Sequence, residues 1–324
     1  MKKSFKLFLA AVFLVTEFFV VALPLMITSA KADGHPIQAI THAGFGGGTD
    51  VTTRMMLLRT RRYLKQDMQL VNKKGGGGAA SMDYMMTLPA DGQHTLTWTT
   101  GHAVSMALGK TKVKLSDMQP LARGTDDPQL FVVNCKNDIK DAKKFISAQK
   151  SKSLKYGTTH VGGIDDVSAI AFTKKGKLTD PTIVPYKGVG PIKTNLIKGD
   201  IDVGVLNLGE AVTEIEDGTL CVSVVLASNR MEKLSNVPTA TELGIPVVLS
   251  TVRGFVTRKG VPSDRKKQLE DAMIKAMEHK YFQSFLTDIG LDSTSVVGAD
   301  EWGKQMEVML AEMTAQLKAL GYIN

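Results

Sequence analysis

Aromatic residues are scarce in this chain of 324 residues, where they make up 6% of the total. The basic residues are dispersed and rarely alternate with aromatics, so the sequence predicts no stripe for binding nucleic acid. It also lacks a low-complexity linker and an internal repeat. With 43% apolar and 22% charged residues the composition is globular, which excludes a disordered chain, a coiled coil, a collagen-like repeat and a protein with many membrane spans.

Motifs of common enzyme and metal-binding families are missing as well. There is no G-x-x-x-x-G-K-[ST] phosphate loop, no G-x-S-x-G nucleophile elbow and no H-E-x-x-H zinc motif. The glycine-rich segment 44–49 lacks the third glycine of the G-x-G-x-x-G dinucleotide fingerprint, and Asn72 stands where that fingerprint has an acidic residue. The sequence therefore predicts a protein that is not an enzyme, with no catalytic residue, no metal site and no cofactor.

Residues 1–32 have the features of an export signal. Three lysines at residues 2–6 precede an apolar stretch at residues 7–27, and residues 30–32 form a small-x-small cleavage site. An uncleaved membrane anchor is the alternative, because the apolar stretch is long, but Pro24 and the cleavage site favour removal of the segment. We expect a periplasmic protein. In that oxidising compartment Cys135 and Cys221 either form a disulfide or remain as two buried thiols.

The remaining length suits two compact domains, and the net charge of +8 suits an anionic ligand. Apolar patterning predicts strands and helices that alternate, with glycine-containing loops between them. Strands are predicted at residues 37–41, 68–71, 95–99, 130–133, 154–157, 182–184, 201–206, 220–227 and 254–257. Helices are predicted at residues 51–65, 80–88, 142–149 and 192–197, from about 165, from 262 and at 300–320. This alternation is typical of a mostly parallel α/β sheet.

Two glycine-rich turns between a strand and a helix are the best candidates for a binding site. Glycine lets a ligand approach the backbone closely, and the N–H groups at the start of a helix attract an anion. An ordinary tight turn is the alternative for either loop alone, but two such loops indicate a carboxylate or phosphate held between two lobes. The candidate ligand-binding residues are Phe45, Gly46, Gly47, Gly48, Thr49 and Asp50 in the first loop, Thr158, Thr159, Gly162, Gly163, Asp165 and Asp166 at the second, and Asn207.

Several short motifs occur in a fixed order along the chain. Residues 46–54 read G-G-x-x-D-x-x-x-R, and residues 72–78 read N-x-x-G-G-G-G, close to N-x-x-G-A-G-G. Further matches are Asp91-Gly92 with Thr95-Leu96, Asp117, Pro120, residues 184–188 and 199–202, Arg230, residues 237–239, Glu242, Gly244, Gly254 and residues 259–262. In this order they resemble the periplasmic substrate-binding receptors of tripartite tricarboxylate transporters, the Bug-type receptors.

This resemblance implies a two-lobe α/β fold of the Venus-flytrap kind, type II, with the ligand in the cleft between the lobes. Lobe one would comprise residues 33–129 and 230–324, and lobe two residues 130–229. It also implies that main-chain groups of residues 45–49 and 158–163 clamp one carboxylate of a small ligand. The receptor would act as a monomer and deliver that ligand to a large and a small membrane subunit.

Some positions depart from the family pattern. Ile164, Asp165 and Asp166 replace the small polar residue and histidine that open the helix after the second loop, Val252-Arg253 replaces an aromatic residue, and Gly209-Glu210 replaces proline-serine. The two aspartates either stabilise the start of a helix or face a ligand whose distal group is cationic or a hydrogen-bond donor. Three other functions fit the same pattern: a receptor for an inorganic oxyanion, a periplasmic enzyme on this scaffold, and a sensor that partners a membrane kinase.

Overall fold

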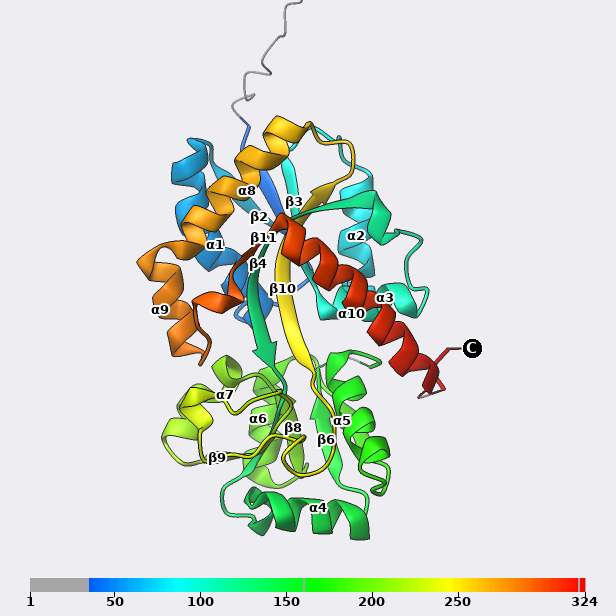
Figure 1. Ribbon diagram of the computed structural model, residues 1–324. Coiled ribbons are helices and arrows are strands. Elements are labelled where there is room, and N and C mark those ends of the chain that lie inside the picture. The colour runs from blue at the N-terminus through cyan, green and yellow to red at the C-terminus, as the bar shows by residue number, and fades with distance from the viewer. Residues whose placement is uncertain (1–34, 160, 320, 324) are drawn as a thin grey trace, which may run out of the picture. The chain divides into compact units, whose positions relative to one another are not determined.

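A computed structural model describes residues 35–159, 161–319 and 321–323 (Figure 1). The predicted export signal at residues 1–32 lies outside the described residues. The unit that begins at Pro36 contains two β-sheets with helices on both faces of each. Of the helices in this described part of the chain, none combines the length and the apolar character that a membrane span requires.

The first sheet has six strands in the order β11-β4-β10-β3-β1-β2. Their bounds are β1 Ile37–Thr41, β2 Met68–Asn72, β3 His94–Thr99, β4 Met118–Pro128, β10 Ser250–Arg258 and β11 Val297–Gly298. β1 pairs in parallel with β2 and β3, whereas β10 is antiparallel to β3 and β4, and β11 is antiparallel to β4.

The second sheet has five strands in the order β7-β6-β8-β5-β9. Their bounds are β5 Leu130–Asn134, β6 Lys155–Thr158, β7 Thr182–Pro185, β8 Val203–Leu206 and β9 Leu220–Val225. β6 is parallel to β7 and β8, and β5 is antiparallel to β8 and β9. The prediction of mostly parallel sheets was therefore wrong. Strands β4, β5 and β10, which carry the chain between the sheets, run against their neighbours.

Each sheet is covered by helices whose apolar faces form the core. On the first sheet, α1 (Gly48–Leu64), α8 (Ser263–Glu278) and α9 (Lys280–Asp288) pack on one face, and α2 (Ala79–Met86), α3 (Thr100–Ala107) and α10 (Ala299–Ala319) on the other (Figure 1). On α10 the buried side chains recur every three to four residues, at Trp302, Met306, Met309, Met313 and Leu317. On the second sheet, α4 (Ala142–Ser151) and α5 (Ile164–Lys175) lie opposite α6 (Val189–Lys198) and α7 (Leu208–Glu216).

The sequence patterns missed α3, α7, α9 and β4. No loop separates β3 from α3, because Thr99 ends the strand and also caps the helix. Proline, glycine and charged residues interrupt the apolar pattern of β4, which nevertheless pairs with β10 along most of its length. Pairing with a neighbouring strand, rather than the strand's own propensity, therefore decides its conformation.

The chain passes between the sheets twice. β4 and β5 are separated only by Gln129, and in Figure 1 β4 and β10 run side by side from one sheet toward the other. On the return, residues 237–249 still lie beside the second sheet: Thr239 bridges to Val225, and the N–H of Leu249 donates to the carbonyl of Leu226 (2.9 Å). The first sheet is rejoined at Ser250. The division into lobes at residues 129 and 229 stays a prediction.

A disulfide joins Cys135 to Cys221, two residues separated by 86 positions in the sequence. Cys135 follows β5 and Cys221 lies in β9, where the antiparallel register brings the two strands together. The bond fixes an edge strand of the second sheet to its neighbour.

We predict that Cys135→Ser/Cys221→Ser lowers the free energy of unfolding by roughly 4–5 kcal/mol, because the bond removes loop-closure entropy from the unfolded chain. Thermal or denaturant unfolding of the exported protein measures this change. Wild-type protein treated with a reductant is the matched control and should unfold with the double variant. Two free thiols in denatured, unreduced protein would contradict the prediction.

Candidate functional site

The first glycine-rich loop connects β1 to α1. Gly46 has a φ of 75°, a left-handed conformation that glycine adopts without strain. Its N–H donates to Oδ2 of the buried Asp50 (3.1 Å), and Nε of Arg54 donates to the same oxygen (2.9 Å). Gly47 precedes the first turn of α1 and offers no side-chain cap. In many helices a side chain accepts hydrogen bonds from the first N–H groups, and α1 has no such cap.

The second loop connects β6 to α5 and is built in the same way. Gly162 has a φ of 68°, and its N–H donates to Oδ2 of the buried Asp166 (2.5 Å). Gly163 precedes α5 and likewise supplies no side-chain cap. Thr159 adds a further brace, since its N–H and its hydroxyl both donate to Oδ2 of Asp165, at 2.8 and 2.6 Å.

Both loops carry one sequence motif, an apolar residue followed by Gly-Gly-x-x-Asp. Residues 45–50 read F-G-G-G-T-D and residues 161–166 read V-G-G-I-D-D. In each case the aspartate is the third residue of the helix and accepts the N–H of the first glycine. The carbonyl of the second glycine then accepts the helix's first backbone bond, at 3.0 Å in α1 and 3.1 Å in α5. The same residues thus dictate the same backbone in both places.

The aspartates of the motif hold their loops together. The N–H groups of Gly46, Thr159 and Gly162, which we expected to face a ligand, donate to carboxylates of their own loops. This geometry favours the helix-start interpretation of Asp165 and Asp166. Among the described residues of both loops, the main-chain donors at the start of α1 and of α5 have no side-chain cap, so they can donate to an anion.

The positions of the two loops in their sheets are equivalent. β1 lies between β2 and β3, and β6 lies between β7 and β8, so each loop leaves the strand at which the chain changes direction across the sheet. In open α/β sheets such a switch point opens a crevice at the carboxyl ends of the strands, and ligands bind there. Topology and loop construction therefore indicate the same two places.

Arg253 of β10 contacts the first loop at Thr49 and the second sheet at Asn207, although no sequence pattern selected it as a site residue. Its guanidinium is buried: Nη1 contacts Oδ2 of Asp127 at 3.0 Å, Nη2 contacts Oδ1 of Asn207 at 3.1 Å, and Nε contacts Oγ1 of Thr49 at 3.2 Å. A Cβ on Gly48 would lie 2.6 Å from Nη2, so a side chain at residue 48 would displace the guanidinium from this position. The sequence did offer one signal for Arg253: it stands in the Val252-Arg253 pair where the family has an aromatic residue.

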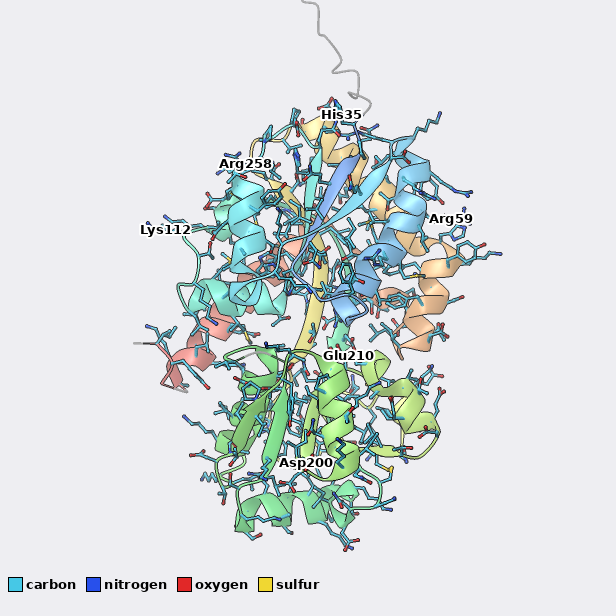
Figure 2. The ribbon with its side chains drawn as sticks, turned by 180° about the vertical axis from the view of Figure 1, so that it is seen from behind. His35, Arg59, Lys112, Asp200, Glu210 and Arg258 are labelled. Atoms are coloured by element: carbon cyan, nitrogen blue, oxygen red, sulfur yellow. A yellow bond between two sulfur atoms is a disulfide. The ribbon has the colours of Figure 1, made fainter. Side chains whose placement is uncertain are left out.

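Asn207 joins this cluster from the second sheet. Its Nδ2 donates to the carbonyls of Asp127 (2.9 Å) and Pro128 (3.0 Å), where β4 ends, and its own N–H donates to Oε2 of Glu210 (3.1 Å). Figure 2 labels Glu210 at the end of the second-sheet region that is turned toward the first sheet. Asn207, predicted as a ligand residue, therefore ties the strand that crosses between the sheets to the start of α7.

Two buried carboxyl groups, those of Asp127 and Asp165, have strongly raised pKa values. Burial raises the pKa of Asp127 to about 7, although the cation of Arg253 opposes the rise and Glu210 adds to it. Burial also raises the pKa of Asp165 to about 7, against the hydrogen bonds from Thr159, while Glu210 and Asp166 raise it further. Glu210 is thus close enough to act electrostatically on both the crossing strand and the second loop.

Several buried polar atoms near the loops have no hydrogen-bond partner within residues 35–159, 161–319 and 321–323. They include Oδ1 of Asp50, Oδ1 of Asp127 and Oγ1 of Thr158. Unsatisfied buried acceptors are costly, so these atoms favour contact with water or with donor groups of a ligand. In the described part of the chain, no three histidine, cysteine, aspartate or glutamate side chains gather as metal ligands would.

We predict that Arg253→Met destabilises the protein by about 3–5 kcal/mol at pH 8, because it leaves the Asp127 carboxylate buried without its cation. Loss of the cation raises the folded-state pKa of Asp127 above about 7. The folded state then holds a proton that the unfolded state releases, so stability falls as the pH rises. The Tm deficit relative to wild type should therefore widen between pH 6 and 9.

The double variant Arg253→Met/Asp127→Asn should lose most of that pH dependence. Arg230→Met is the matched control, because the Arg230–Glu242 pair is about half exposed and such pairs contribute at most about 1 kcal/mol. An Arg253→Met deficit that stays constant from pH 6 to 9 would contradict the prediction.

The sequence is similar to known receptors over most of its length. Residues 52–320 match the family described as "Tripartite tricarboxylate transporter family receptor". Over 220 residues the chain is 27% identical to protein BugT of Bordetella pertussis. The aligned region covers 65% of this chain and 66% of BugT.

Solved structures agree with this match. MatC from Rhodopseudomonas palustris with bound malate superposes with a TM-score of 0.77 and 23% identity, over 87% of this chain and 98% of MatC. An R. palustris protein with adipate superposes with a TM-score of 0.79 and 21% identity, over 88% of this chain and 97% of that chain. The predicted two-lobe α/β fold of a periplasmic binding protein is confirmed. With its family match and its motifs in agreement, the chain belongs to the receptors of the tripartite tricarboxylate transporter family.

Proposed function

We propose that this protein is a solute-binding receptor that captures a small organic carboxylate and delivers it to the large and small membrane subunits of a tripartite transporter. One observation carries the proposal: the same glycine-rich helix start occurs at the switch point of both sheets. Relatives of the same fold hold malate and adipate, which are carboxylates, and this supports the choice of ligand class.

In this proposal the first loop binds the carboxylate through the N–H groups of Gly48 and Thr49, which begin α1. A guanidinium has five N–H donors. In the described part of the chain, Nε, Nη1 and one N–H of Nη2 of Arg253 have partners, so the second N–H of Nη2, next to Gly48, remains for a ligand. That donor would add a charged hydrogen bond to the main-chain contacts. The second loop would approach the ligand from the other sheet. Asp50 would position the first loop, and Asp165 and Asp166 would position the second.

The proposal also includes where the receptor works and what it does not do. Removal of residues 1–32 would release the mature receptor into the periplasm as a monomer, with lobe two near residues 130–229. The ligand would leave chemically unchanged, since the role is capture and delivery without catalysis. N-terminal sequencing of the exported protein should find Asp33 as its first residue.

A thermal-shift screen over mono-, di- and tricarboxylates, amino acids, sulfate and phosphate tests the function. A ligand at ~100-fold over its Kd should stabilise the fold by about 2.7 kcal/mol. Stabilisation by sulfate or phosphate but by no carboxylate would replace the proposal with an oxyanion receptor. A new product detected by mass spectrometry after incubation with a bound ligand would indicate an enzyme.

We predict that Gly47→Val abolishes carboxylate binding and leaves the fold intact. Gly47 has φ −73° and ψ 158°, which valine adopts readily, and its Cβ would lie at an ordinary 3.4 Å from the carbonyl oxygen of Gly44. The added methyl groups would cover the N–H groups that begin α1. Isothermal titration measures binding and thermal unfolding measures the fold.

Thr194→Val is the control, because this exposed residue belongs to α6, outside both loops, and valine has nearly the same shape as threonine. It should bind like wild type. Normal carboxylate binding by Gly47→Val would show that the first loop is not the carboxylate site.

A further inference from the structure

The apolar residue that opens each loop motif is exposed to solvent. Phe45 is 77% exposed and Val161 is 69% exposed, more than any other large apolar side chain in the described part of the chain. Both occupy the first position of the shared motif, directly before the glycine with positive φ. Exposing two large apolar side chains at equivalent points of a binding site is typical of surfaces that a ligand covers.

The first loop is surrounded mainly by cations. Arg253 lies beneath it at Thr49, and the charged groups of Arg54 and Lys74 lie 5.9 and 5.5 Å from the centre of the Phe45 ring. The carboxylates nearby are those of Asp50 and Asp127, each of which has an arginine partner. An anion is therefore favoured at this loop.

The second loop has the same backbone but the opposite charge. Asp165 and Asp166 belong to it, and Glu210 acts on it strongly enough to raise the pKa of Asp165. The cation of Lys110 also lies beside this loop, with Nζ 3.9 Å from the place that a Cβ of Gly162 would take. A side chain of Leu108 lies at 3.5 Å from the same place. A second ligand carboxylate would meet three carboxylates there, and like charges that are partly buried repel strongly.

We infer that the ligand is a monocarboxylate with a hydrocarbon body: its carboxylate binds the first loop, and its uncharged body lies against Phe45 and Val161 toward the second. This inference rests on the proposed receptor function and specifies its ligand. The identical backbones of the two loops would otherwise accept a dicarboxylate symmetrically. Because the charges at the two loops differ, the ligand would bind in one orientation, with its carboxylate at the first loop. The two apolar side chains would favour methylene or aromatic groups.

Ligands matched in length separate the alternatives. Hexanoate, adipate and 6-aminohexanoate share a six-carbon chain and differ at the far end, which is a methyl, a carboxylate or an ammonium group. Butyrate, succinate and 4-aminobutyrate repeat the comparison with four carbons. In isothermal titration at pH 8 we expect the monocarboxylate of at least one set to bind ~10-fold tighter than its dicarboxylate and its amino acid.

Two substitutions test the residues that carry the inference. Phe45→Ala should weaken the preferred monocarboxylate ~10-fold, with exposed Val308→Ala on α10 as the control that leaves binding unchanged. Glu210→Gln keeps an acceptor for the N–H of Asn207 but removes the charge, and it should raise dicarboxylate affinity relative to monocarboxylate affinity. Exposed Glu216→Gln on the same helix is its control.

The outcomes distinguish this inference from the function on which it rests. If dicarboxylates bind tighter than their matched monocarboxylates, the receptor function stands and the ligand class is wrong. Tighter binding of the amino acids would show that the far end of the ligand is cationic, and the inferred hydrocarbon end would be wrong. If no carboxylate of any kind binds in the titrations or in the wider screen, both the inference and the proposed function fail.

Discussion

The buried ion pair between Arg253 and Asp127 connects the parts of the molecule on which binding depends. Its guanidinium contacts Thr49 in the first loop and Asn207 at the end of a strand in the second sheet, while Asp127 lies on the strand that crosses between the sheets. A buried charge without a partner is strongly destabilising, so each of these contacts depends on the others. The guanidinium also lies close to Gly48, where an added Cβ would be 2.6 Å from Nη2.

The same Gly-Gly-x-x-Asp motif forms both loops, but the charges around the two loops differ. The Gly-Gly-x-x-Asp motif satisfies the N–H before the helix with an internal carboxylate and leaves the first helical N–H groups without a side-chain cap. A helix start of this kind attracts an anion, but the charges around it decide whether the attraction survives. Cations of Arg253, Arg54 and Lys74 strengthen it at the first loop, whereas the carboxylate of Glu210 opposes it at the second.

The raised pKa values of Asp127 and Asp165 follow from the same arrangement. Both carboxyl groups are buried near Glu210, and burial outweighs the hydrogen bonds and the cation that favour their charged forms. A carboxyl group with a pKa of about 7 changes its charge near neutral pH. The electrostatic field at the second loop is therefore weaker in mildly acidic conditions than in alkaline ones.

Much of the fold could be read from the sequence. Apolar periodicity located β1, β6, α1 and α10, and the glycine loops were recognised as turns that lead from a strand into a helix. The order of short motifs was sufficient to indicate the family, which the comparison over residues 52–320 confirms. Local patterns succeed here because each of these features is decided within a few residues of sequence.

Tertiary structure decided the rest. β4 has no strand pattern of its own and is extended because β10 pairs with it, and the antiparallel direction of β5, β9 and β10 follows from the passage of the chain between two sheets. The partners of Asp165 and Asp166 could not be chosen from sequence, since a carboxylate at a helix start can face either its own loop or a ligand. The departure at Arg253 was visible in the sequence, but its partners could not be predicted, because its three main contacts come from residues 46 to 204 positions away. Burial and long-range charge pairing depend on which segments the fold brings together, and no local pattern carries that information.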